Sequence, residues 1–165
     1  MFCCEWNQLE YASIGLDSTA SLVNVETQNM LSCINPPVIS SVFAQDFQNQ
    51  HVILNGCRNG SIWIWDIRTP SCIKVMTSSS LCIKKQSSLH SIYSLEKEQN
   101  QFICSTSLGQ MLKVDLRNHK TIVEYVGNTS DHHKSRFCTV CTKDVGLNYI
   151  IYMCIGSFRF KFNCL

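Results

Sequence analysis

One short pattern recurs along this sequence and limits what the chain can fold into. In its clearest copy, Asn59-Gly60 is followed by the β-branched and aromatic run Ser61–Trp65 and then by Asp66-Ile67-Arg68. Asn-Gly favours a tight hairpin turn because both residues tolerate positive φ, and the run after it is typical of a buried strand. The pattern therefore predicts a β-hairpin whose second strand ends in a polar turn.

Two further copies keep the order of turn, strand and polar end. The copy at Leu108–Arg117 lies 49 residues after the first and has Val114 where the first has tryptophan. The copy at Leu16–Glu26 lies 42 residues before it and carries Asn24 and Glu26 in place of the aspartate and the arginine. Three unrelated hairpins are the alternative, but a spacing of ~40–45 residues is the period of four-stranded propeller blades.

Each copy extends into a unit of up to four strands, and no sustained helical period is present. A Trp-Asp pair at the end of a strand is the signature of WD40 blades. We therefore expect an all-β fold, an incomplete WD40 β-propeller over residues 1–165, with blades at approximately 1–35, 41–76, 90–126 and an incomplete 136–162. The expected strands are Phe2–Glu5, Tyr11–Leu16, Ala20–Val25, Met30–Cys33, Ser41–Phe47, His51–Cys57, Ser61–Asp66, Cys72–Met76, Ile92–Leu95, Phe102–Ser107, Met111–Asp115, Thr121–Tyr125, Phe137–Thr142, Tyr149–Ile155 and Phe158–Phe162.

Length sets the number of blades. The 165 residues hold about three and a half to four blades of ~40–45 residues, whereas WD40 propellers typically close with about seven. We expect the chain to be part of a propeller, as a fragment, a splice form or an incomplete gene model, and a closed four-bladed ring is the alternative. Thr77–His90 and Gly127–Arg136 are expected to be long connections.

Composition narrows the classes of partner and the compartment. The net charge of +2 gives no reason to expect nucleic-acid or membrane binding. The longest apolar run, Tyr149–Gly156, is far shorter than the ~20 residues of a membrane helix, and no secretory signal is recognised. We expect a soluble protein of the nucleus or cytoplasm. Its 11 cysteines are then expected to be reduced, with Cys57, Cys104 and Cys154 buried as small apolar residues.

Few residues are candidates for catalysis or metal binding. Cys138 and Cys141, preceded by His132 and His133, offer ligands for a zinc ion or a thiol site, which we keep as an alternative. The two cysteines fall in an expected strand, where residues three apart face opposite sides, and the histidines lack the usual spacing. With no nucleotide-binding glycine loop and no nucleophile elbow, we predict no catalytic residue, no cofactor and no metal.

The two Asp-x-Arg ends are the strongest candidates for a binding site. Asp66 and Asp115 are expected to close the turn after their strands by accepting backbone N–H bonds. The resemblance to WD40 blades, many of which have a buried histidine bonded to the strand-end aspartate, makes His90 a candidate partner for Asp115, and a partly exposed histidine is the alternative. Arg68 and Arg117 are expected on one rim of the disc, about one blade apart. An arginine fork suits the carboxylates and backbone carbonyls of a partner, and an internal salt bridge or a solvated charge is the alternative.

These residues resemble a known family. Trp65-Asp66-Ile67-Arg68 matches the WDxR box of the WD40-repeat substrate receptors of cullin-4 ubiquitin ligases, and Val114–Arg117 matches its degenerate form. The string Ile53–Ile62 extends the similarity, which runs over roughly Phe2–Ser157. The first unit departs from the box, because it has Glu26 at the position of the arginine.

The resemblance implies a non-catalytic subunit that works by binding other proteins. It implies that Arg68 and Arg117, with Trp65, Asp66 and Asp115, dock the large propeller adaptor of the ligase, its damaged-DNA-binding protein subunit. Another face or the mouth of the pore is then expected to present a protein substrate for ubiquitination. A generic WD-repeat scaffold without a link to ubiquitin is the alternative.

Overall fold

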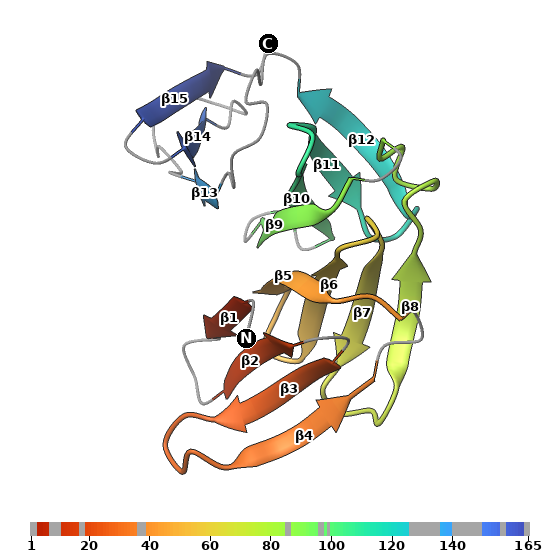
Figure 1. The fold of residues 1–165 in the computed structure, drawn as a ribbon, viewed down its shortest axis with the longest axis vertical. Coiled ribbons are helices and arrows are strands. Elements are labelled where there is room, and N and C mark those ends of the chain that lie inside the picture. Colours follow the sequence, from red (N-terminus) through yellow and green to blue (C-terminus); the bar gives the residue numbers. More distant parts are fainter. Residues whose placement is uncertain are drawn as a thin grey trace.

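The computed structural model describes the backbone of residues 3–6, 11–16, 19–35, 39–84, 87–95, 98, 100–125, 136–139, 150–155 and 158–163. These residues form fifteen β-strands and no helix, grouped into four antiparallel sheets in the order of the chain (Figure 1). The all-β prediction is therefore confirmed. None of the residues described forms a helix long and apolar enough to cross a membrane.

Within every sheet, neighbouring strands are also neighbours in the sequence. The first sheet contains β1 (Cys3–Trp6), β2 (Tyr11–Leu16), β3 (Thr19–Asn24) and β4 (Met30–Ile34). The second contains β5 (Val42–Phe47), β6 (Val52–Cys57), β7 (Ile62–Asp66) and β8 (Cys72–Met76). The third contains β9 (Leu89–Ser94), β10 (Gln101–Thr106), β11 (Met111–Asp115) and β12 (Lys120–Tyr125). The last contains β13 (Arg136–Thr139), β14 (Ile150–Ile155) and β15 (Phe158–Asn163). Each expected strand overlaps an observed one.

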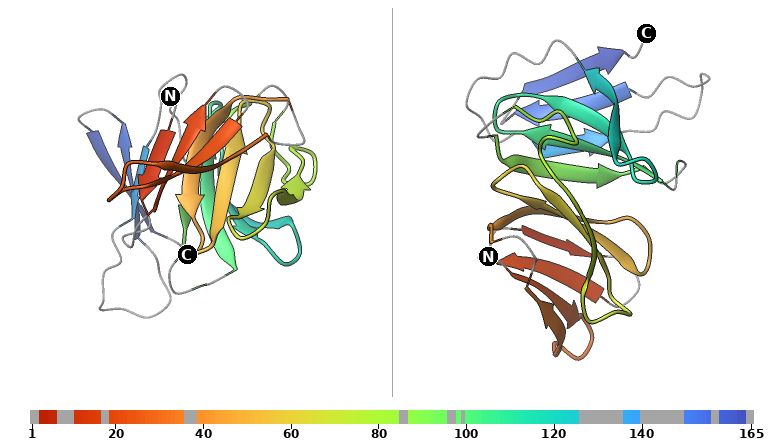
Figure 2. Two further views of the ribbon diagram at one scale, coloured as in Figure 1. Left: turned by 90° about the horizontal axis from the view of Figure 1, so that it is seen from below. Right: turned by 90° about the vertical axis from the view of Figure 1, so that its right-hand side faces the viewer.

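The sheets follow one another along an arc. The first strands of the sheets lie innermost, and β5 contacts both β1 and β9, while β9 also contacts β13. The outermost strands of the first three sheets are β4, β8 and β12 (Figure 1). The right-hand view in Figure 2 shows the first three sheets following one another in chain order. This arrangement is that of consecutive blades of a propeller.

Apolar side chains fill the spaces between successive sheets. The cluster between the first and second sheets consists of Ala20, Leu22, Ile34, Val42, Ile53, Cys57, Trp63 and Trp65. The cluster between the second and third sheets includes Leu54, Ile62, Ile64, Phe102, Cys104, Leu112 and Val114. Because both faces of the second sheet are covered, all five residues of β7 are buried. This explains why its sequence is continuously apolar up to Asp66 instead of alternating.

Two of the three predicted buried cysteines can be checked. Cys57 and Cys104 are both fully buried, as predicted, and burial raises the pKa of the Cys104 thiol to about 12. Cys154 lies outside the residues whose burial is described. The two buried thiols therefore pack as apolar groups between the sheets.

Glycine fixes the turns that the repeated pattern predicts. Gly60 and Gly109 have φ of 78° and 75°, and their amides donate to Cys57 O and Thr106 O at 3.1 Å in both cases. A Cβ atom at Gly60 would also lie 2.8 Å from the carbonyl oxygen of Ser87. Backbone conformation and close packing therefore both require glycine at this turn.

The expected connection Thr77–His90 is anchored to the third sheet. Leu81 is fully buried, and its carbonyl accepts a 2.7 Å hydrogen bond from the hydroxyl of Thr121. The amide of Lys84 donates to Gln110 Oε1 at 2.8 Å. The connection ends earlier than expected, because β9 already begins at Leu89. The other expected connection, Gly127–Arg136, lies outside the described residues except for Arg136.

Candidate functional site: the arginine rim

The turns of an antiparallel sheet alternate between its two ends, and this places the Asp-x-Arg segments. In the second sheet the β5–β6 and β7–β8 turns share one end, and in the third the β9–β10 and β11–β12 turns do so. Asp46 of β5 accepts a hydrogen bond from the amide of Ser94 in β9, so the ends of these two inner strands lie side by side. The Asp-x-Arg segments of β7 and β11 therefore lie on one edge, which we call the arginine rim.

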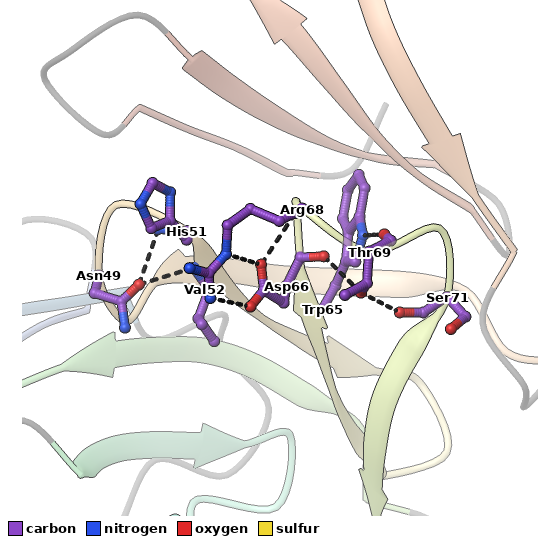
Figure 3. A network of polar contacts seen from close by, with 8 residues as sticks. All are labelled: Asn49, His51, Val52, Trp65, Asp66, Arg68, Thr69 and Ser71. Carbon is purple, nitrogen blue, oxygen red and sulfur yellow. Dashed lines mark hydrogen bonds and ion pairs between the residues drawn. The ribbon is translucent and has the colours of Figure 1, made fainter.

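In the second sheet, Arg68 folds back onto the carboxylate of Asp66. Its backbone N and its Nε donate to Asp66 Oδ1 at 3.0 and 2.9 Å, and its Nη2 donates to Oδ2 at 2.5 Å. Figure 3 shows the guanidinium between Asp66 and the turn of Asn49 and His51. The aspartate thus closes the turn, as expected, and also fixes the direction of the arginine.

The third sheet repeats this arrangement at Asp115 and Arg117. The backbone N and the Nε of Arg117 donate to Asp115 Oδ1 at 2.8 and 3.3 Å, and Nη2 donates to Oδ2 at 3.0 Å. The side chains of Arg68 and Arg117 are 64% and 65% exposed, whereas those of Asp66 and Asp115 are 10% and 8% exposed. The internal salt bridge is therefore present on both sheets, together with two accessible guanidinium groups.

The backbone around both segments is supported in the same way. The amide of Ile67 donates to His51 O at 2.9 Å, and that of Leu116 donates to Asn100 O at 2.8 Å. Trp65 is buried, and its Nε1 donates to Thr69 O at 3.2 Å, so the indole braces the turn from inside. Val114 is fully buried in the equivalent place, and the Asp-Arg geometry is the same without the tryptophan.

The ion pairs shift the titration of their members. The hydrogen bond from the Arg68 side chain lowers the pKa of Asp66 to about 2, and the bond from Arg117 lowers the pKa of Asp115. The pKa of each arginine is raised by its aspartate. Both pairs therefore stay charged at neutral pH. The bonds to aspartate use Nε and Nη2, and Nη1 takes no part in them.

The first sheet has a different turn at this position. Asn24 Oδ1 accepts hydrogen bonds from the backbone N and the hydroxyl of Thr27, at 2.7 and 3.0 Å. Glu26, which replaces the arginine, is exposed. The charge at the corresponding position is therefore reversed, and two adjacent sheets, not three, carry the Asp-Arg pair among the residues described.

Among the described residues, the sequence candidate His90 is not brought to this rim. His90 lies in β9, where its ring contacts that of Phe43 with centroids 6.4 Å apart, and the Asp115 carboxylate accepts from Arg117 instead. Of the zinc candidates, His132, His133 and Cys141 lie outside the described residues, and Cys138 is described only as backbone of β13. In the part of the chain that is described, no three potential ligands are grouped for a metal.

One supporting residue was missed from the sequence. Asn49 Oδ1 accepts hydrogen bonds from the amides of His51 and Val52, at 2.8 and 3.0 Å (Figure 3). This cap stabilises the β5–β6 turn. The carbonyl of His51 in that turn accepts the hydrogen bond from the amide of Ile67. The signal was an asparagine three residues before the first residue of β6, which is typical of an Asx-turn.

The sequence matches no protein-family model and no curated protein. Among solved structures, the fold is similar to a chain in the crystal structure of the mitotic checkpoint complex. The TM-score is 0.71 at 15% sequence identity, and the match covers 91% of this chain and 46% of that one. The chain thus spans about half the length of its structural neighbour. The fold is that of a WD40-type β-propeller, of which the described sheets form a part.

Proposed function

We propose that this chain is the WD40 interaction module of a substrate receptor of a cullin-4 RING ubiquitin ligase. In this role it has no catalytic residue. The arginine rim docks the propeller adaptor of the ligase, its damaged-DNA-binding protein subunit, and another surface presents a protein substrate for ubiquitination. The observation that carries the proposal is the pair Arg68 and Arg117, held alike on adjacent sheets and about two-thirds exposed.

The sequence supports the same assignment independently of the geometry. Trp65–Arg68 resembles the docking box of these receptors, and Val114–Arg117 resembles its degenerate form. The string Ile53–Ile62 resembles one member in particular, cullin-4-associated factor 4, which is also called WD-repeat protein 21. That string forms most of β6, in which Ile53 pairs with Trp65, and the β6–β7 turn at the other end of the sheet.

The geometry suits a protein partner because the arginines are already ordered. A free arginine loses side-chain entropy when a partner immobilises it, whereas Asp66 and Asp115 already hold these two. Arginine is also among the residues that contribute most to protein interfaces. A partner that offers carboxylates or backbone carbonyls at the matching separation would receive charge-assisted hydrogen bonds from both.

The test is a pull-down of the purified adaptor by the chain carrying Arg68→Ala and Arg117→Ala. We expect each single variant to weaken binding about tenfold and the double variant to abolish recovery. Arg58→Ala is the matched control, because Arg58 is an exposed arginine in the β6–β7 turn, at the end of the second sheet opposite the arginine rim. Circular dichroism of all variants checks that the sheets remain folded.

A scaffold of the WD-repeat type with no link to ubiquitin is the second candidate, and Glu26 is the observation that favours it. Glu26 occupies, in the first sheet, the position of Arg68 and Arg117, so the repeated pattern does not require an arginine there. The unaltered chain separates the two candidates. Adaptor recovery that is absent, or that is equal for the wild type and the double variant, would assign the scaffold role.

A further inference from the structure

The inner strands β5 and β9 each contain a β-bulge near their first residues. The pairing of β5 with β6 skips Phe43, and the pairing of β9 with β10 skips His90. A bulge turns the extra side chain out of the regular alternation of its strand. The two bulges occupy corresponding places in neighbouring sheets, and the residue at each bulge, Phe43 or His90, has a ring as its side chain.

The rings of Phe43 and His90 meet between the two inner strands. Their centroids are 6.4 Å apart, the planes are tilted by 53°, and both side chains are only partly buried. Because strands β5 and β9 begin here and end at the arginine rim, the ring pair lies at the opposite end of the sheets. It is therefore a separate surface from the Asp-Arg pairs.

Exposed apolar side chains lie at this same end. Ile39, in the segment that leads into β5, is 96% exposed, and Leu108, in the β10–β11 turn, is 48% exposed. Hydrogen bonds fix the segment beside the β6–β7 turn, because Ser41 O accepts from the amide of Arg58 at 2.9 Å and Ser40 Oγ accepts from that of Asn59 at 3.1 Å. The apolar positions are thus held by ordered backbone.

Two exposed cations lie at this end among the residues that the structure describes. Arg58 and Lys84 are exposed in the turn and the connection that meet there. Glu124, in the outer strand β12, accepts a 3.1 Å hydrogen bond from Gln110. A ligand with carboxylates complements Arg58, whose fork binds a carboxylate with two parallel hydrogen bonds.

We propose that Ile39, Phe43, Arg58, His90 and Leu108, the ring-pair face, bind an extended peptide segment of a partner protein. The segment carries an apolar side chain that packs on the two rings and a neighbouring aspartate or glutamate that pairs with Arg58. A nucleic acid fits less well, because a net charge of +2 does not provide the many phosphate contacts that such binding uses. If the proposed function holds, this face receives the substrate.

The experiment is selection of a random twelve-residue peptide library, displayed on phage, against the immobilised full chain. We expect enriched peptides to contain an apolar residue beside Asp or Glu. Synthetic peptides from that set should lose at least about tenfold in affinity with Phe43→Ala and with Arg58→Glu, measured by fluorescence anisotropy. Arg58 is exposed, so its variant remains informative if Phe43→Ala fails to fold.

Lys120→Glu is the control, since it makes the same charge change away from this face and should leave the peptide affinity unchanged. Selection that enriches no sequence, or peptides without carboxylates, would overturn the proposal, and so would peptides that bind the Arg58→Glu variant normally. The selection contains no adaptor. Its failure is therefore distinct from failure of the pull-down that tests the arginine rim.

Discussion

At the scale of single residues, the aspartate of each Asp-x-Arg segment both closes the turn and orients the arginine side chain. The aspartate accepts from the backbone of the arginine two residues later, which closes the turn, and then binds the side chain of the same arginine. The sequence predicted the turn because an aspartate at a strand end commonly accepts such a bond. It left the side chain of Arg68 open, because spacing alone does not decide between an internal pair and a solvated rotamer.

The lowered pKa of Asp66 predicts how stability varies with pH. The folded pKa of about 2 lies below the ordinary value near 4, so the contribution of ionised Asp66 is complete above about pH 5 and is lost as pH falls towards 2. Asp66→Asn should therefore reduce the free energy of unfolding more at pH 7 than at pH 3. Urea unfolding of both proteins at the two pH values measures this difference.

Asp46 provides a control of opposite sign. Burial raises its pKa above the ordinary 3.8, so its contribution is present at low pH and is lost as pH rises through the folded pKa. The stability of the wild type relative to Asp46→Asn should therefore decrease from pH 3 to pH 7. A stability difference for Asp66→Asn that does not change with pH would contradict the role of the ion pair.

At the scale of elements, the connection from β8 to β9 behaves as part of the third sheet. Leu81 and Ile83 enter the cluster between the second and third sheets, and Gln110 accepts from Lys84 N while its Nε2 donates to Cys82 O at 3.5 Å. The sequence predicted a serine- and lysine-rich loop but not its anchoring. Gln110 follows a turn glycine and carries no pattern that identifies its distant partner.

Gln110→Ala should loosen this connection selectively. The variant removes the side-chain acceptor of the Lys84 amide, at a cost of about 1 kcal/mol in the free energy of unfolding. Hydrogen exchange at the Lys84 amide should accelerate, whereas exchange at the amides of Arg68 and Arg117 should stay unchanged. Thr121→Val, which removes only the hydroxyl bond to Leu81 O, should give a smaller effect. Unaltered exchange at Lys84 would contradict the anchoring.

Strand boundaries show the same limit of sequence reasoning. The strand expected at Ile92–Leu95 is observed as Leu89–Ser94. Its beginning was missed because His90 occupies the bulge and Ser91 is polar, which together interrupt the apolar alternation used to recognise strands. In the second sheet, β7 was placed within one residue, because its entire sequence is apolar up to Asp66.

At the scale of the whole molecule, stability depends on contacts between sheets. A sheet in this fold has no core of its own, and its faces are covered by its neighbours. The spacing of the repeats predicted several blades in a row. It did not predict which side chains meet between blades, because those contacts join residues from different units of the repeat.

Phe102→Ala tests this dependence. Phe102 is fully buried in the cluster between the second and third sheets, so its truncation should cost about 3–5 kcal/mol. Trp63 and Trp65 belong to the second sheet and Trp6 to the first, so tryptophan fluorescence reports the unfolding of these two sheets and not of the third. Their transition in urea should shift together with the transition seen by circular dichroism, although the substitution is in the third sheet.

Ile122→Ala is the control, because Ile122 is 49% exposed on β12, and its effect should stay within about 0.5 kcal/mol. Two separate transitions in Phe102→Ala, with that of the tryptophans unshifted, would show that the sheets unfold independently. The fold would then be an array of autonomous sheets instead of one cooperative unit.

If the arginine rim docks a partner as proposed, the repetition of the Asp-Arg pair on two sheets affects discrimination between partners. Two contact points that are fixed relative to each other act as a bivalent anchor, because engagement of the first raises the effective concentration of the second. A surface that matches both would gain the product of two modest affinities without a further loss of freedom. A surface that matches only one of the arginines would gain only that one contact. The separation of the two arginines would therefore select a partner whose acceptor groups have the same separation.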